Sequence, residues 1–127
     1  IIQTSQRSSV MSRLAEINDR VEAIASLAGA TTTHKNSYPA WQPNISSPLL
    51  QRCQDLYTQL YNREPVVQII HAGLECGLIG AKIPDMDLIS LGPTIKYPHS
   101  PGEKLYIPSV GQVWEFLLAL LKSYVTA

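Results

Sequence analysis

Cysteine, net charge and long apolar runs are scarce in this 127-residue sequence, and each shortage excludes a class of protein. The two cysteines, Cys53 and Cys76, are too few for a disulfide framework, and free thiols are typical of a reducing cytosol. Because ten basic residues balance ten acidic residues, the formal net charge of +0 favours neither nucleic acid nor anionic lipid. The longest apolar run, residues 116–121, is far too short to span a membrane. We therefore expect a soluble, cytoplasmic protein that binds neither nucleic acid nor membrane.

The chain is about one domain long, and its first residues suggest a fragment. Residues 1–7 alternate apolar and polar side chains without an initiator methionine, which is typical of the end of a strand. A strand needs hydrogen-bonded neighbours, and the sequence offers none nearby. This pattern predicts partner strands upstream of residue 1.

The first third of the sequence predicts a strand, a helix and a second strand. Apolar residues at three- and four-residue steps place one stripe along the helix, at Val10, Leu14, Ile17, Val21, Ile24 and Leu27. Residues 8–9 predict its N-cap and Gly29 its C-terminal end, while the Thr-rich residues 30–34 favour a strand. Three prolines in residues 36–48 predict a linker, with a boundary between subdomains near Pro43.

The remaining sequence predicts helix, strand, short helix and strand in succession. Ser47 and Pro48 form a cap followed by proline at the first helical position. Two apolar runs, residues 66–70 and 86–91, predict buried strands. Between them a short helix is predicted, ended by Gly80 and a turn at residues 83–85.

A last helix completes an α/β pattern. A capping box at residues 109–112 predicts its start. Its apolar stripe is wide enough to pack on a sheet and consists of Val110, Val113, Trp114, Leu117, Leu118 and Leu121. The predicted fold class is α/β, with helices flanking a sheet.

Function is expected in the loops after the two buried strands, because open α/β sheets place ligands at the carboxyl ends of their strands. Side chains able to do chemistry gather there: His71, Glu75, Cys76, His99 and Glu103. No Cys-x-x-Cys, His-Glu-x-x-His or acidic cluster is present, so spacing alone selects neither a metal site nor a catalytic pair. Some of these residues also have a simpler explanation. His99 could be an ordinary turn histidine, Glu75 an acid that favours the first turn of a helix, and Cys76 a buried thiol.

Several short stretches of the sequence are informative through their exact residues as well as through the spacing of those residues. They are residues 71–77 (His-Ala-Gly-Leu-Glu-Cys-Gly), residues 87–95 (Asp-Leu-Ile-Ser-Leu-Gly-Pro-Thr-Ile) and residues 99–101 (His-Ser-Pro), together with residues 38–43 and 7–9. These strings closely resemble the C-terminal part of the aminoacyl-histidine dipeptidases, also called Xaa-His or cytosol non-specific dipeptidases. The family lies in the carnosinase- and aminoacylase-like class of zinc peptidases. Its members are several times longer than this chain and carry a two-metal catalytic domain with an inserted lid domain.

The resemblance implies one metal ligand and three substrate contacts. His99 matches a ligand to one of two zinc ions, for which cobalt or manganese can substitute. The other ligands and the general base lie in the N-terminal half of the family, so no catalytic residue is expected here. Arg7 matches an arginine that holds the substrate carboxylate, and His71 and Glu75 would line the substrate end of the cleft. Gly102 stands where the family usually has an aspartate, which removes an acid able to orient the loop.

The resemblance also divides the chain. Residues 1–43 match the C-terminal part of the lid, or dimerisation, domain, and residues 44–127 match the closing segment of the catalytic domain. The parent protein is expected to be a cytoplasmic zinc dipeptidase that hydrolyses Xaa-His and other dipeptides, and the resemblance allows a homodimer through the lid. Because one ligand cannot hold a catalytic zinc ion, the 127-residue chain should be inactive alone.

Two other functions are left open. One is a non-catalytic interaction module that has kept a peptidase scaffold and pairs through an exposed strand edge. The other is a cysteine hydrolase in which His71 activates Cys76. A thiol alkylating agent would inactivate such an enzyme. A full set of metal ligands upstream would favour the dipeptidase over the interaction module.

Overall fold

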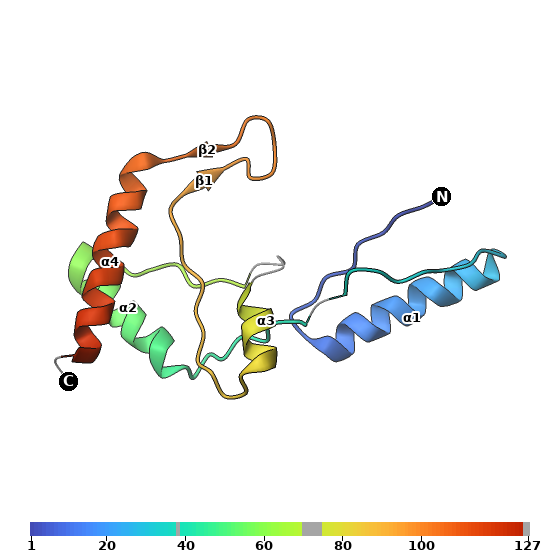
Figure 1. Ribbon diagram of the computed structural model, residues 1–127, viewed down its shortest axis with the longest axis horizontal. Helices are drawn as coiled ribbons and strands as arrows, with labels where there is room; N and C mark the ends of the chain where they lie inside the picture. Colours follow the sequence, from blue (N-terminus) through green and yellow to red (C-terminus); the bar gives the residue numbers. More distant parts are fainter. Residues whose placement is uncertain (38, 70–74, 126–127) are drawn as a thin grey trace. The chain divides into compact units, whose positions relative to one another are not determined.

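The computed structural model describes residues 1–37, 39–69 and 75–125 and divides the chain into two compact units (Figure 1). The first unit comprises Ile1–Asn44 and Gln68–Leu88, and the second comprises Ile45–Val67 and Ile89–Ala127. Each unit is thus built from two stretches of chain. No helix in the described ranges is both long and apolar enough to cross a membrane.

Helix α1, Met11–Leu27, is the main element of the first unit. Gly29 has a φ of +70° and follows the cap residue Ala28, so it ends the helix as predicted. Its N–H donates to the carbonyl of Ser26, and the N–H of Ala30 donates to the carbonyl of Ala25, which is the Schellman arrangement. The predicted N-cap is wrong by one residue, because Val10 takes this position without a side-chain cap.

Helix α3, Glu75–Lys82, packs on the segment that joins α1 to the second unit. A Cβ added at Gly77 would lie 2.9 Å from the carbonyl oxygen of Pro39 and 3.6 Å from Cβ of Trp41. Residues 39–41 and 75–77 belong to two of the strings that carry the family resemblance, so the fold brings these strings into contact. The helix continues past Gly80 to Lys82, with the N–H of Ile83 donating to the carbonyl of Ile79, and the predicted turn at residues 83–85 follows it.

Helix α2, Pro48–Tyr61, starts as the sequence predicts. The Ser47 side chain accepts a hydrogen bond from the N–H of Leu50 at 2.9 Å, and Pro48 occupies the first turn. Asn62 ends the helix in the left-handed region with a φ of 49°.

Helix α4, Ile107–Val125, packs against α2 and forms the core of the second unit. The buried apolar residues are Cys53, Phe116 and Leu120, and the half-buried residues around them are Leu49, Leu56, Tyr57, Tyr61 and Ile89. Two hydrogen bonds fasten the helices near their ends. An Nη atom of Arg52 donates to the carbonyl of Ser123 at 2.7 Å, and the Tyr61 hydroxyl donates to the carbonyl of Gln112 at 2.7 Å.

The sheet of the described residues is one antiparallel hairpin, formed by β1 (Ile95–Lys96) and β2 (Lys104–Leu105). Ile95 pairs with Leu105, and Lys96 pairs with Lys104. None of the segments predicted as strands joins a ladder among the described residues. The predictions at residues 30–34 and 86–91 are wrong for this structure, as is the one at residues 66–70 for its described part, 66–69. The strand predicted at residues 1–7 joins no ladder here, and its partners were predicted upstream of residue 1. A strand is defined by its hydrogen-bonded neighbour, and an apolar run alone does not supply one.

Candidate functional site

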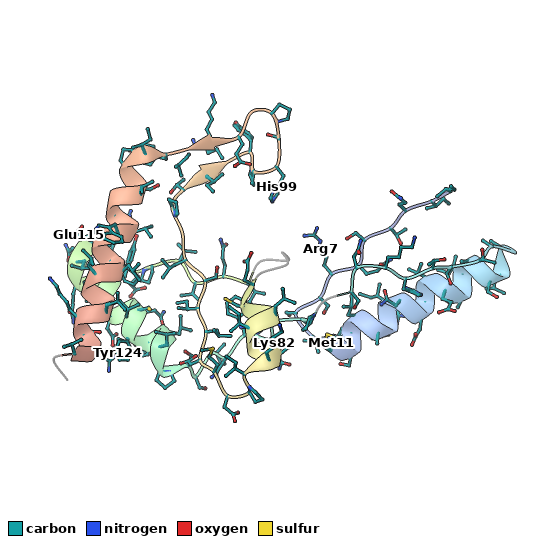
Figure 2. The ribbon with its side chains drawn as sticks, in the orientation of Figure 1. Arg7, Met11, Lys82, His99, Glu115 and Tyr124 are labelled. Atoms are coloured by element: carbon teal, nitrogen blue, oxygen red, sulfur yellow. The ribbon has the colours of Figure 1, made fainter. Side chains whose placement is uncertain are left out.

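The loop that joins β1 to β2, residues 97–103, contains the His-Ser-Pro string and presents His99. Tyr97 and His99 have φ values of 54° and 61°, a left-handed conformation that residues other than glycine rarely adopt. Strained backbone of this kind persists only where the surroundings hold it. Figure 2 shows the side chain of His99 pointing outward from a corner of this loop.

Three hydrogen bonds within the loop maintain this shape. The N–H of His99 donates to Oε2 of Glu103 at 2.7 Å, and the Ser100 hydroxyl donates to the carbonyl of Tyr97 at 2.7 Å. The N–H of Glu103 donates to the carbonyl of Ser100 at 3.0 Å. All donors and acceptors lie between residues 97 and 103, so the loop holds itself.

Ser109 connects the base of the hairpin to α4. Its buried hydroxyl accepts a hydrogen bond from the N–H of Thr94 at 2.9 Å and donates one to the carbonyl of Tyr106 at 2.6 Å. The N–H of Tyr106 in turn donates to the carbonyl of Thr94 at 2.9 Å. The predicted capping box at Ser109 is wrong, because the helix starts at Ile107 and the hydroxyl binds the hairpin instead.

The side chain of His99 is exposed and shares no hydrogen bond or ion pair with another described residue. Both ring nitrogens are thus available, and a neutral imidazole is a common ligand for zinc. Within the described ranges, no group of three or more His, Cys, Asp or Glu side chains could hold a metal ion. Among the described residues, the exposed imidazole of His99 therefore belongs to no such group.

Arg7 and Glu75, two of the predicted substrate contacts, both lie in the first unit, whereas His99 lies in the second. Arg7 is exposed in the extended segment that precedes α1 (Figure 2). Glu75 is exposed at the first residue of α3, where its charge favours the helix N-terminus. His71 lies outside the described residues.

Cys53 and Cys76 form no disulfide; Cys53 is a buried residue of α2 that packs in the core with α4, and Cys76 is half-buried in α3. The cysteine-hydrolase alternative needs His71 beside Cys76, and that pair falls outside the described part of the chain.

Sequence reasoning missed the roles of Glu103 and Ser109. Glu103 was noted only as a candidate for the site, although it stands four residues after His99, a separation that a tight loop can close. For Ser109 the overlooked signal is Pro108, because proline favours the first turn of a helix and so predicts a start before Ser109.

Comparison with known proteins first defines the class of this fold. The chain matches the crystal structure of aminoacylhistidine dipeptidase from Vibrio alginolyticus with a TM-score of 0.73 and 40% sequence identity. This match covers 91% of the present chain and 24% of the other. The fold is therefore that of part of a dipeptidase, which confirms the predicted α/β peptidase class.

A sequence match then points to a particular group of dipeptidases. The chain is 49% identical over 102 residues to the cytosol non-specific dipeptidase of Escherichia coli (strain K12), covering 80% of this chain and 21% of that protein. No protein-family model matches the chain. The two relatives confirm the resemblance, and the chain is homologous to part of the aminoacyl-histidine dipeptidases. It spans less than a quarter of the length of either relative.

Proposed function

We propose that this chain forms the C-terminal part of a zinc-dependent dipeptidase that hydrolyses Xaa-His and other dipeptides in the cytoplasm. The observation that carries the proposal is the 49% identity to a cytosol non-specific dipeptidase, and the structural match to an aminoacylhistidine dipeptidase agrees with it. Residues 1–43 would close the lid domain, and residues 44–127 would close the catalytic domain.

In this proposal His99 donates a neutral imidazole nitrogen to one zinc ion of a pair. Bound zinc supplies polarisation of the peptide carbonyl and activation of water, and cobalt or manganese can take its place. The other residues of this chain would hold His99 in position. The self-held loop of residues 97–103 fixes the backbone of His99, and Ser109 fixes that loop to α4.

Three further residues are proposed to contact the dipeptide. The guanidinium of Arg7 would bind its free carboxylate, because a planar fork of N–H donors matches the two carboxylate oxygens. His71 and Glu75 would shape the substrate end of the cleft. No residue of this chain acts as the general base, and a catalytic zinc site needs about three protein ligands. The 127-residue chain alone is therefore expected to be inactive.

The proposal is tested by replacing His99 in the whole protein that carries this chain. His99→Ala should lower the bound zinc and abolish most hydrolysis of a Xaa-His dipeptide, while the far-UV circular dichroism spectrum stays unchanged. His34→Ala is the matched control, because His34 is exposed and its contact is with Glu22, 3.6 Å away. Wild-type zinc content and rate in the His99→Ala protein would contradict the proposal.

The whole protein is also proposed to form a homodimer through the lid domain, of which residues 1–43 would be the C-terminal part. Large apolar side chains of α1 are exposed in this chain, with Ile24 68% and Leu27 91% exposed. The same surface would serve the interaction-module alternative, in which the scaffold has no activity. Light scattering of the whole protein should give a dimer, and Ile24→Glu together with Leu27→Glu should give a monomer. Loss of dimerisation with full hydrolysis would separate assembly from catalysis.

A further inference from the structure

The backbone amide of His99 forms a charge-assisted hydrogen bond, which is the strongest contact of its loop. Its acceptor is the carboxylate oxygen Oε2 of Glu103 at 2.7 Å, whereas the other two loop bonds end on neutral carbonyls. Hydrogen bonds to an ionised acceptor are roughly twice as strong as neutral ones. Glu103 therefore contributes more than its neighbours to keeping His99 in the left-handed region.

The direction of the His99 side chain follows from this backbone conformation. At a φ of 61° the Cβ of His99 leaves the chain in a direction that an extended or right-handed backbone would not give. Without the carboxylate of Glu103, the neighbouring residues Tyr97 and Ser100 still share a hydrogen bond, but the amide of His99 has no partner in the loop. The imidazole would then sample several directions.

We propose that Glu103 is a positioning residue, which holds the His99 amide so that the imidazole is aimed before a metal ion arrives. This inference rests on the proposed function, because it assigns the loop the task of presenting a ligand. In this role Oε2 of Glu103 serves the backbone of its own loop. Groups that orient a ligand in this way typically change metal affinity 10- to 100-fold when they are replaced.

The neighbouring residue Gly102 is consistent with the positioning role of Glu103. The carboxylate that closes the loop belongs to Glu103, the residue that follows Gly102. A Cβ added at Gly102 would meet only Ser100 Oγ at 3.8 Å, so the position has room for a side chain but no contact that the loop depends on.

The first test concerns the loop alone and needs no metal. In the metal-free 127-residue chain, the amide proton of His99 should resonate downfield and exchange slowly with solvent. Glu103→Ala should move this resonance upfield and speed its exchange, and Glu103→Gln should have a smaller effect because its amide oxygen still accepts a hydrogen bond. Glu64→Ala is the control. Glu64 is exposed and lies in the same unit as Glu103, so its replacement removes the same charge from that unit.

The second test measures zinc affinity of the whole protein by competition with a chelator. Glu103→Ala should weaken zinc binding about 10- to 100-fold, with partial recovery in Glu103→Gln and no change in Glu64→Ala. An unchanged His99 amide in Glu103→Ala, or a changed amide with wild-type zinc affinity, would overturn the positioning role alone. A wild-type protein that binds no zinc would overturn the proposed function as well.

Discussion

Helices α1 and α4 have similar lengths, 17 and 19 residues, and both were predicted from an apolar stripe, yet only α4 has buried side chains. Phe116 and Leu120 of α4 are each 7% exposed, because α2 covers them. No residue of α1 is buried, and Leu27 is 91% exposed. The comparison shows that periodicity predicts where a helix forms, whereas a partner decides whether its stripe becomes a core.

The largest expected effect comes from removing the centre of the α2–α4 core. Phe116→Ala in the 127-residue chain should lower the free energy of unfolding by about 3 kcal/mol, because it leaves a cavity beside Cys53 and removes the ring contact to Tyr57 at 5.9 Å. Leu27→Ala in α1 should change it by less than about 0.5 kcal/mol. Urea unfolding followed by circular dichroism measures both. Equal losses would show that α1 is as well packed as α4.

A second contrast concerns two glycines inside helices. Gly77→Ala should destabilise the first unit by about 1–3 kcal/mol, because the new Cβ would lie 2.9 Å from the carbonyl oxygen of Pro39. Gly111→Ala in α4 meets no atom within 4 Å and should stabilise the chain by about 0.5–1 kcal/mol. The measurement is hydrogen exchange of α3 and α4 amides. A stabilising Gly77→Ala would contradict the packing of α3 on residues 39–41.

A third contrast separates two glycines outside helices by their φ values. Gly29→Ala should cost about 1 kcal/mol, because its φ of +70° is unfavourable for a residue with a Cβ. Gly102 does not have a positive φ, so Gly102→Asp should leave stability within about 0.5 kcal/mol of the wild type. Thermal unfolding of the two variants checks this order, and the reverse order would contradict it.

The smallest expected effect is a pH dependence in the second unit. Burial, then the nearby carboxylate of Glu115, raises the pKa of Tyr61 above its ordinary value of 10.0. Folding therefore favours the protonated phenol, whose stabilising contribution is complete below about pH 10 and is lost as pH rises through the higher pKa of the folded state. Between about pH 9 and 11, the free energy of unfolding should fall less in Tyr61→Phe than in the wild type, as measured by urea unfolding. The usual tyrosine pKa of about 10 sets this pH window. Identical alkaline profiles would exclude the effect.

Local signals predicted the start of α2 and the end of α1, because these ends depend on a few adjacent residues, but they missed the starts of α1 and α4. Ser47 with Pro48 started α2, and Gly29 ended α1, as the physics of orphan N–H and carbonyl groups requires. Strands were predicted poorly. Residues 66–69 and 86–91 have suitable apolar character, but pairing depends on distant segments that no local pattern specifies.

The candidate site shows the same limit. The string at residues 99–101 identified His99, and the dipeptidase relatives agree with the resemblance that it carried. The left-handed backbone of His99 and its bond to Glu103 could not be predicted, because proline-rich loops have many closures that satisfy the same composition.

The most direct test of the central claim is anomalous diffraction at the zinc edge on crystals of the whole protein. The account predicts a zinc peak about 2.0–2.1 Å from an imidazole nitrogen of His99, with the amide of His99 still bound to Glu103. A zinc site whose ligands do not include His99 would contradict the account.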